Sequence, residues 1–235
     1  MQCIILAAGE GVRMRPLTLH TPKPLLRVGG KTLLEHQLDI LPMEVDEIII
    51  VVGYLGQQII DYFGNHFRGK KITYVWQEKK EGTYRALALC QGLIKDAPFL
   101  MLYADDIFDE KSIRRLVESP FPALLVASHD HPERFGVVET NADGKITRIE
   151  EKPAQPKSNW VNCGPVKLVP QIFDYPPSVH ANGEYYLPVS INQMLSDVSF
   201  YAIPTQTWIP IGYPEDLAKA EKARSLLNPN KNKHV

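Results

Sequence analysis

The stretch Cys-Ile-Ile-Leu-Ala-Ala-Gly-Glu-Gly, residues 3–11, joins an uninterrupted apolar run to a glycine pair. An apolar run that ends in glycine is typical of a β-strand buried on both faces, as in a parallel sheet. Residues 47–53 contain a second run of this kind, Ile-Ile-Ile-Val-Val. The sequence therefore predicts parallel strands, with a glycine loop at the carboxyl end of the first one.

Outward from this strand, short apolar runs alternate with amphipathic segments. Strands are predicted at residues 3–8, 47–53, 71–77, 99–103 and 123–127, and helices at residues 31–41, 57–67, 83–94 and 112–118. This alternation predicts βαβ units and a mostly parallel sheet. We expect Thr83 to cap the third helix, and we expect its apolar residues to be buried: Ala86, Leu87, Leu89, Cys90 and Leu93.

The alternation of predicted strands and helices changes after about residue 130. Residues 136–139 and 145–150 are joined by Asn-Ala-Asp-Gly, residues 141–144, which predicts an antiparallel hairpin. The remaining predictions are strands at residues 161–169 and 198–203 and helices at residues 187–195 and 215–227. The simplest interpretation is a single α/β domain over residues 1–227, followed by a polar, frayed tail at residues 228–235.

Composition excludes several classes of protein. The chain has 235 residues, with 26 Lys and Arg against 27 Asp and Glu, so it lacks the basic excess of a general nucleic-acid binder. No apolar run approaches the roughly 18–20 residues of a membrane span, and the first residues lack the basic region of a signal peptide. The scattered cysteines Cys3, Cys90 and Cys163 favour a reducing, cytoplasmic location.

The glycine loop is the first candidate site. Gly9 and Gly11 allow backbone N–H groups to approach a phosphate, and Arg13 offers a guanidinium to its oxygens. A tight turn with solvated arginines explains the same residues equally well. The third glycine of a dinucleotide fingerprint and the Gly-Lys-Ser/Thr of a Walker loop are both absent from this segment.

A lysine between two prolines, Pro22-Lys23-Pro24, follows the loop. The prolines predict a stiff, extended backbone, which is a suitable mount for a cation that reaches a phosphate. Taken alone, the motif is better explained as an exposed lysine in a proline-rich loop.

Together the two motifs, Leu-Ala-Ala-Gly-x-Gly-x-Arg-Met-x-Pro-Leu-Thr and then Pro-Lys-Pro-Leu, are similar to the signature of the nucleotidyltransferases that make nucleoside-diphosphate sugars. The resemblance implies a Rossmann-like three-layer α/β/α fold with a mixed, mainly parallel central sheet, of the nucleotide-diphospho-sugar transferase type. It also implies transfer of a nucleotidyl group from a nucleoside triphosphate to a sugar 1-phosphate, which releases pyrophosphate. The nucleotide-binding residues that it implies are Leu6, Ala8, Gly9, Gly11, Arg13, Gln77, Gly82 and Thr83.

Two further motifs extend the resemblance. Gln77 and Gly82 resemble the family's base-reading pair and favour UTP or dTTP as the donor, although a plain surface loop also fits. The segment Ala-Asp-Asp-Ile-Phe, residues 104–108, resembles the family's metal motif. It implies that Asp105 binds Mg²⁺ with Asp106 in support, whereas an acidic helix cap is the alternative.

The sugar-phosphate site is implied by four weaker motifs. They are Phe-Gly-Val-Val-Glu, Glu-Lys-Pro, Asn-Cys-Gly and Gly-Glu-Tyr-Tyr, and they contribute Gly136, Glu151, Lys152, Asn162 and Glu184. In this order they extend the resemblance to nearly the whole chain. The family also implies a homo-oligomer, and the short remainder of the chain leads us to expect no additional β-helix domain with acyltransferase activity.

The sequence departs from the family at two places. Pro210 stands where the family's Trp-x-Asp-x-Gly-Thr motif has its second metal ligand. Three explanations compete: Mg²⁺ is held by Asp105, water and phosphates, or Glu184 or Asp106 stands in, or the site is impaired. Tyr84, which follows Gly-Thr, takes the place of a smaller residue.

The implied mechanism needs no general base, because a phosphate monoester is already anionic near neutral pH. Arg13 would bind the triphosphate, Lys23 the reacting phosphate and Lys152 the sugar phosphate, so alignment and charge neutralisation carry catalysis. Two alternatives are a nucleotide-sugar-binding regulator and a cytidylyltransferase that acts on phosphocholine. His129 and His131 have metal-ligand spacing, but a solvated loop explains them better.

Overall fold

The strand that opens the chain, β1 (Gln2–Ala7), lies inside the main sheet of the computed structural model, which describes residues 1–227. The predicted tail at residues 228–235 lies outside the described residues. β1 pairs in parallel with β4 (Glu47–Val52) on one side and with β7 (Phe99–Tyr103) on the other. A third parallel pair joins β4 to β6 (Lys70–Trp76), so the four strands form the parallel core that the apolar runs predict.

The other elements follow the predicted alternation. The remaining strands are β2 (Arg27–Val28), β3 (Lys31–Thr32), β5 (His66–Phe67), β8 (Ile107–Phe108), β9 (Ala123–Ser128), β10 (Gly136–Thr140), β11 (Ile146–Glu151), β12 (Trp160–Leu168), β13 (Tyr201–Pro204) and β14 (Trp208–Ile209). The helices are α1 (Leu33–Asp39), α2 (Gly56–Phe63), α3 (Thr83–Ala88), α4 (Glu110–Glu118), α5 (Leu187–Met194) and α6 (Pro214–Leu227).

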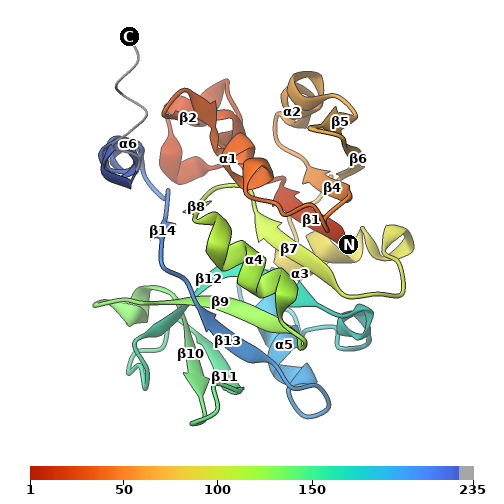
Figure 1. Ribbon diagram of the computed structural model, residues 1–235, viewed down its shortest axis with the longest axis vertical. Helices are drawn as coiled ribbons and strands as arrows, with labels where there is room; N and C mark the ends of the chain where they lie inside the picture. The colour runs from red at the N-terminus through yellow and green to blue at the C-terminus, as the bar shows by residue number, and fades with distance from the viewer. Residues whose placement is uncertain (228–235) are drawn as a thin grey trace.

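The main sheet is mixed, with antiparallel strands beside its parallel core. Its order is β11-β10-β12-β7-β1-β4-β6-β5, and β9 joins β12 to β13. The hairpin of β10 and β11 is antiparallel, as the turn at residues 141–144 predicts. β12 is antiparallel to β7, β9 and β10 and connects this hairpin to the parallel core (Figure 1).

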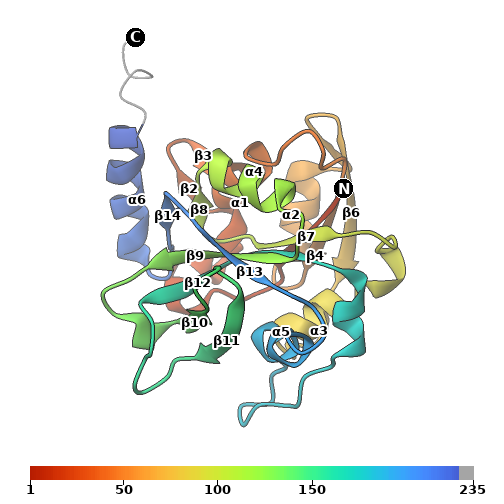
Figure 2. The same cartoon turned by 60° about the horizontal axis from the view of Figure 1, so that its bottom comes forward.

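Helices cover both faces of the sheet, which gives the three layers expected from the resemblance. Figure 2 shows α1 and α4 on one side and α3 and α5 on the other. Alternate residues of β1 supply the two cores: Ile5 packs with α1, α2 and α4, whereas Ile4 packs with α3 and α5. A strand buried on both faces requires the continuous apolar run that the sequence contains.

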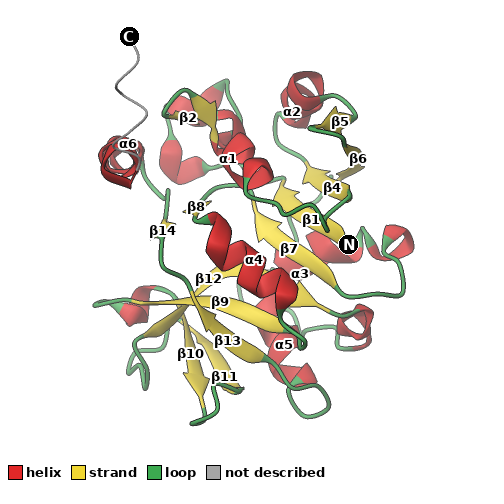
Figure 3. Ribbon diagram, in the orientation of Figure 1, coloured by secondary structure: helices red, strands yellow, loops and turns green. Residues whose placement is uncertain are grey.

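The last helix, α6, packs outside these layers. Figure 3 shows it apart from the sheet, beside β2. Ala220 of α6 joins Met14, Val28 and Ile211 in a separate apolar cluster. The end of the chain therefore packs against the segment that follows the glycine loop. Within residues 1–227, no helix has both the length and the apolar character that crossing a membrane requires.

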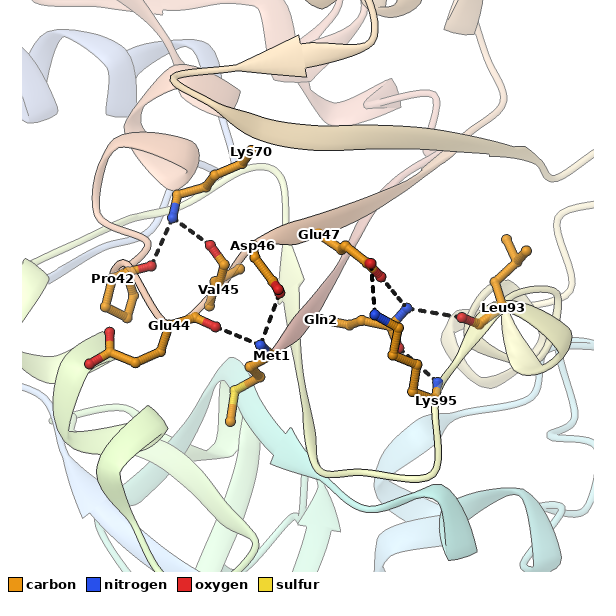
Figure 4. Close-up of polar contacts among 10 residues, drawn as sticks. All are labelled: Met1, Gln2, Pro42, Glu44, Val45, Asp46, Glu47, Lys70, Leu93 and Lys95. Atoms are coloured by element: carbon orange, nitrogen blue, oxygen red, sulfur yellow. Dashed lines mark hydrogen bonds and ion pairs between the residues drawn. The ribbon is translucent and has the colours of Figure 1, made fainter.

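Side-chain contacts tie the amino ends of the parallel strands together (Figure 4). Gln2 of β1 donates from Nε2 to the Glu47 carboxylate at the start of β4 (3.0 Å). Lys70, at the start of β6, donates from Nζ to the carbonyl oxygens of Pro42 (2.8 Å) and Val45. These contacts lie at the edge opposite to the strands' carboxyl ends, which remain available for a ligand.

Several predicted elements are shorter in the structure. α1 begins at Leu33 because the Thr32 side chain caps it, in a reciprocal capping box with Glu35. α2 ends before Gly64, whose φ of 59° stops the helix. The strand predicted at residues 198–203 begins only at Tyr201.

The helix predicted at residues 83–94 was the least accurate. α3 ends at Ala88, and a 3-10 turn covers Gln91–Leu93. Leu89 and Leu93 are 48% and 45% exposed, so the prediction that they are buried is wrong. Helical spacing continues through these residues, but the α-helix ends at Ala88 and the 3-10 turn at Gln91–Leu93 places them differently.

Candidate active site

A cavity of about 450 Å³ opens at the carboxyl ends of β1, β6 and β7. β4 and β7 flank β1 on opposite sides, which makes this the switch point where open α/β sheets bind ligands. All eight residues predicted to bind a nucleotide line the cavity, together with Lys23, Asp105 and Glu184. The motifs are separated in sequence and meet here in space.

The glycine loop packs directly against the lysine motif. Gly11 has a φ of 60°, and a Cβ at this position would lie 3.2 Å from Lys23 Cβ and 3.1 Å from Thr18 Cγ2. The Thr18 hydroxyl donates to the Gly11 carbonyl (2.8 Å). Glycine is therefore required both for its conformation and for its close contact, whereas a Cβ at Gly9 would meet open space.

Lys23 reaches the floor of the cavity from a turn. The structure shows a 3-10 turn over Lys23–Leu25, so the prediction of an extended backbone at the lysine is wrong; Pro22 alone is extended. The Leu25 amide donates to the Pro22 carbonyl (2.9 Å), and this bond closes the turn. The side chain is 10% exposed, and Nζ lies 2.7 Å from Asp105 Oδ2.

The two aspartates after β7 have different surroundings. The Asp105 side chain is 39% exposed and lines the cavity. Asp106 accepts hydrogen bonds at both oxygens, from Trp208 Nε1 (2.8 Å) and from the Ile211 amide (3.0 Å). Burial, reinforced by the charge of Asp105, raises the pKa of Asp106 to about 7.

The hydrogen bonds of Asp106 concern the position of Pro210, where the family has its second metal ligand. Pro210 lies between Trp208 and Ile211, so the segment that departs from the family is held beside the aspartates through Asp106. Because both oxygens of Asp106 already accept hydrogen bonds, the geometry favours a supporting role for it over a ligand role. Within residues 1–227, no group of three or more His, Cys, Asp or Glu side chains is placed to hold a metal ion.

Arg13 lies in the 3-10 turn Val12–Met14 and lines the cavity. Its guanidinium carbon lies 5.5 Å from the centroid of the Tyr213 ring. The amides of Gly212 and Tyr213 both donate to Asp216 Oδ2 (3.0 and 2.9 Å), which fixes the turn before α6. The arginine is therefore supported by a segment two hundred residues away in the sequence.

The start of α3 differs from the prediction that Thr83 is its cap. Gly82 occupies the N-cap position, with a φ of 92°. The Thr83 hydroxyl accepts instead from the Leu187 amide (3.0 Å) at the start of α5. Thr83 thus joins two helices across the cavity wall and does not close the end of one.

Four residues of the predicted sugar-phosphate site form a separate group. Gly136 pairs with Glu151 across β10 and β11, and a Cβ on Gly136 would lie 3.1 Å from Glu151 Oε2 and 3.6 Å from Asn162 Cβ. Lys152 follows with a φ of 45°, and its amide donates to the Phe135 carbonyl (2.9 Å). None of these four lines the 450 Å³ cavity, whereas Glu184 does.

Tyr103, the last residue of β7, connects the two groups. It lines the cavity, and its ring packs against Gly164 of β12. Burial raises the pKa of Tyr103 to about 12, with Asp105 on one side and Glu151 on the other acting in the same direction.

Sequence reasoning missed Tyr103, Glu10 and Lys80 as cavity residues. Glu10 and Lys80 form an ion pair across the opening. Their positions in the sequence could have identified them as cavity residues. Glu10 lies between the two glycines of the loop, and Lys80 lies between Gln77 and Gly82. Tyr103 could have been found as the strand's last residue before the aspartates.

The two histidines with metal spacing belong to an aromatic cluster. The His129 ring lies 4.6 Å from the Phe135 ring, which lies 5.3 Å from the Trp208 ring. His129 Nδ1 accepts from the His131 amide (2.9 Å). This nitrogen is therefore engaged within the loop itself.

Comparison with known proteins agrees with this geometry. Residues 2–225 match the sequence model of the Nucleotidyl transferase family. The UTP–glucose-1-phosphate uridylyltransferase AglF of Haloferax volcanii is 35% identical over 233 residues, which cover 94% of this chain and 96% of AglF. The bifunctional protein GlmU of Methanococcus maripaludis is 36% identical over 225 residues, which cover 94% of this chain and 53% of GlmU.

Solved structures show the same fold. A Bacillus anthracis protein, assigned as a glucose-1-phosphate thymidylyltransferase and crystallised with sucrose, has a TM-score of 0.85 at 28% identity and covers 100% of this chain and 98% of its own. A UDP-glucose pyrophosphorylase bound to UDP-glucose has a TM-score of 0.84 at 21% identity, over 96% of this chain and 98% of its own. Because the family match spans nearly the whole chain, this protein belongs to the nucleotidyl transferase family of enzymes and has the nucleotide-diphospho-sugar transferase fold.

Proposed function

We propose that the protein transfers a nucleotidyl group from UTP or dTTP to a sugar 1-phosphate, giving a nucleoside-diphosphate sugar and pyrophosphate. The observation that carries the proposal is the meeting of Gly11, Lys23 and Asp105 at the floor of one cavity. The similarity to AglF over 96% of that protein's length supports a sugar 1-phosphate acceptor. Gln77 and Gly82 in the cavity wall support the pyrimidine preference.

The reaction is an in-line displacement at the α-phosphorus. An oxygen of the sugar phosphate forms the new bond to the α-phosphorus, and the bond from the α-phosphorus to the oxygen that bridges it to the β-phosphorus breaks. That oxygen leaves with the pyrophosphate. Because the attacking phosphate is already anionic, the site must align the reactants and neutralise charge. We assign Arg13 to the triphosphate and the departing pyrophosphate, and Lys152 to the sugar phosphate.

Lys23 is assigned to the reacting phosphate. Its ammonium is mostly buried and pairs with Asp105, so a phosphate oxygen that enters the cavity would compete with a carboxylate already in contact. A buried cation in a fixed position stabilises developing negative charge with little reorganisation. Glu151, Asn162, Glu184 and the backbone of Gly136 are assigned to the sugar.

Mg²⁺ fits this site as an ion held mainly by its substrates. Asp105 offers one exposed carboxylate, and Mg²⁺ is commonly held in proteins by one or two carboxylates together with water and phosphate oxygens. When bound, the ion would supply positive charge beside the phosphates. This explanation needs no second protein ligand and is compatible with Pro210.

The proposal extends to organisation and location. The main sheet includes strands from β1, near the start of the chain, to β13, at Tyr201–Pro204, which supports a single domain over residues 1–227. Cys3, Cys90 and Cys163 are buried and free, which supports a reducing cytoplasm.

The test measures pyrophosphate release with Mg²⁺ for five nucleoside triphosphates crossed with a panel of sugar 1-phosphates. One strongly active pair containing UTP or dTTP would support the proposal and name the sugar. A clear preference for GTP would contradict the roles of Gln77 and Gly82. Nucleotide binding without turnover on any acceptor would favour a regulator with an impaired metal site, and turnover of CTP with phosphocholine would favour the cytidylyltransferase.

A further inference from the structure

Two segments that are a hundred residues apart run side by side in the cavity wall. The Tyr185 amide donates to the Glu81 carbonyl (2.8 Å), and the Tyr84 amide donates to the Tyr185 carbonyl (3.0 Å). The bond from the Leu187 amide to Thr83 extends the same pairing. The loop after β6 and the segment before α5 are therefore joined by successive hydrogen bonds.

The contact is close as well as hydrogen-bonded. A Cβ on Gly82 would lie 2.6 Å from the Tyr185 carbonyl oxygen and 2.7 Å from its nitrogen. Both obstacles are backbone atoms, which cannot rotate away as a flexible side chain can. The two segments consequently approach as closely as main chains allow, and a shift of one displaces the other.

Arg85 adds a side-chain contact to this pairing. Its guanidinium carbon lies 4.4 Å from the centroid of the Tyr185 ring, whereas the stacks of Arg27 and Arg68 lie at 5.7 and 5.5 Å. Arg85 does not line the 450 Å³ cavity but a second cavity of about 520 Å³ on the outer side of the wall. Arg85 therefore contacts Tyr185 without lining the 450 Å³ cavity.

In the segment before α5, Glu184 lines the catalytic cavity. It precedes Tyr185, and its carboxylate accepts from Asn182 Nδ2 (3.3 Å). Its backbone is held by the His180 amide, which donates to the Glu184 carbonyl (2.8 Å), and by Asn182 Oδ1, which accepts from the Glu184 amide (3.2 Å). On the other side, the position of Glu184 depends on the contacts that hold Tyr185.

We propose that Arg85 is a positioning residue: by stacking on Tyr185 it holds Glu184 in place for the sugar 1-phosphate and couples that position to the base-reading loop. The proposal rests on the proposed function. The backbone bond comes from residue 84 and the stack from its neighbour Arg85, so adjacent residues hold Tyr185 in two ways. An exposed arginine here has a role although it touches no substrate.

The first test compares steady-state kinetics of Arg85→Ala and Arg85→Lys with those of the unaltered enzyme. We expect Arg85→Ala to raise KM for the sugar 1-phosphate about two- to fivefold, the size of one exposed cation–π contact. Because the reacting groups are untouched, kcat should stay within about twofold, and the lysine should restore part of the loss. Arg27→Ala removes a comparable stack away from the cavity and should leave KM unchanged.

The second test asks whether Arg85 acts through Glu184. In a Glu184→Gln background, Arg85→Ala should add little to the rise in KM, because the position that it stabilises is no longer occupied by a carboxylate. Fully additive effects of the two substitutions would overturn the proposal. An unchanged KM in Arg85→Ala alone would overturn it as well.

Hydrogen exchange separates this inference from the proposed function. In Arg85→Ala, the amides of Tyr84, Tyr185 and Leu187 should exchange faster in the absence of any substrate, whereas those of β1 should not. If the unaltered enzyme proves inactive with every pair of substrates, the proposed function fails, and the exchange rates still decide whether Arg85 holds the wall. Unchanged exchange at all three amides would refute the stacking role.

Discussion

The packing of Gly164 on Tyr103 leads to a quantitative prediction for Gly164→Ala. Gly164 has a φ of 108°, and a Cβ there would lie 2.5 Å from Tyr103 Cδ2 and 3.0 Å from Cε2. The backbone conformation costs an alanine about 1–2 kcal/mol. Forcing one methyl group into a packed contact costs a further ~1–3 kcal/mol. The expected loss of stability is therefore about 2–5 kcal/mol.

Gly144 provides a matched control. Its φ is 78°, but a Cβ at this position meets no atom within 4 Å. Gly144→Ala should therefore cost only the conformational part, about 1–2 kcal/mol. The difference between the two variants contains the contact with the Tyr103 ring, together with the added cost of the higher φ at Gly164.

The assay is urea unfolding of both variants, followed by circular dichroism and supported by thermal melts. A loss of 1 kcal/mol corresponds to roughly 2–4 °C in Tm for a protein of this size. Since Tyr103 lines the cavity, Gly164→Ala should also raise KM for the nucleotide, and Gly144→Ala should not. Equal destabilisation by the two substitutions would refute the reasoning, because strain alone would then account for both.

Three further predictions concern the cavity and its supports. Arg13→Ala should lower kcat by about 10²–10³, the effect of losing one preorganised donor of about 2.7–4 kcal/mol, and a fall of less than threefold would sink the assignment of Arg13. Tyr213→Ala should raise KM for the nucleotide about two- to fivefold through the lost stack on Arg13, while Tyr213→Phe should behave as the unaltered enzyme does. Asp109 caps α4 and accepts from the Thr207 amide (2.9 Å), and these hydrogen bonds outweigh the effect of partial burial and lower its pKa. Its ionised form therefore stabilises the fold above the ordinary aspartate pKa of about 3.9, and this contribution is lost as the pH falls through the lower folded value. Asp109→Asn should cost about 1–2 kcal/mol at pH 7, and its deficit in urea unfolding should shrink below pH 4; a deficit independent of pH would contradict the linkage.

The parallel core was predictable because its strands are apolar on both faces. The boundaries predicted for β7, Phe99–Tyr103, are confirmed. β1 begins and ends one residue earlier than predicted, and β4 ends one residue earlier. Such runs leave little choice of structure, since every residue must be covered. Helix ends were harder, because the cap of α1 and the stop of α2 depend on Thr32 and Gly64 individually.

The residues that line the 450 Å³ cavity could be found from motifs because those motifs follow the ends of β1, β6 and β7. Periodicity could not predict which contacts hold those residues in place. The pairing of Lys23 with Asp105 and the contact of Gly11 with Lys23 depend on side-chain packing between distant segments. The hydrogen bond from the Leu187 amide to the Thr83 hydroxyl also joins distant segments. It occupies the hydroxyl that the sequence predicted to cap α3.

The hydrogen bonds of Asp106 have a consequence for the order in which the protein can form during synthesis. The two donors to its carboxylate, the Trp208 indole and the Ile211 backbone amide, lie 102 and 105 residues further along the chain. While the first half emerges from the ribosome, the aspartate therefore has neither partner and must remain hydrated. The glycine loop, the lysine and both aspartates are all translated by then, yet Asp106 has both of its hydrogen-bond donors only after Ile211 has emerged. A nascent chain of this protein consequently completes the support beneath its two aspartates only after residue 211 has emerged.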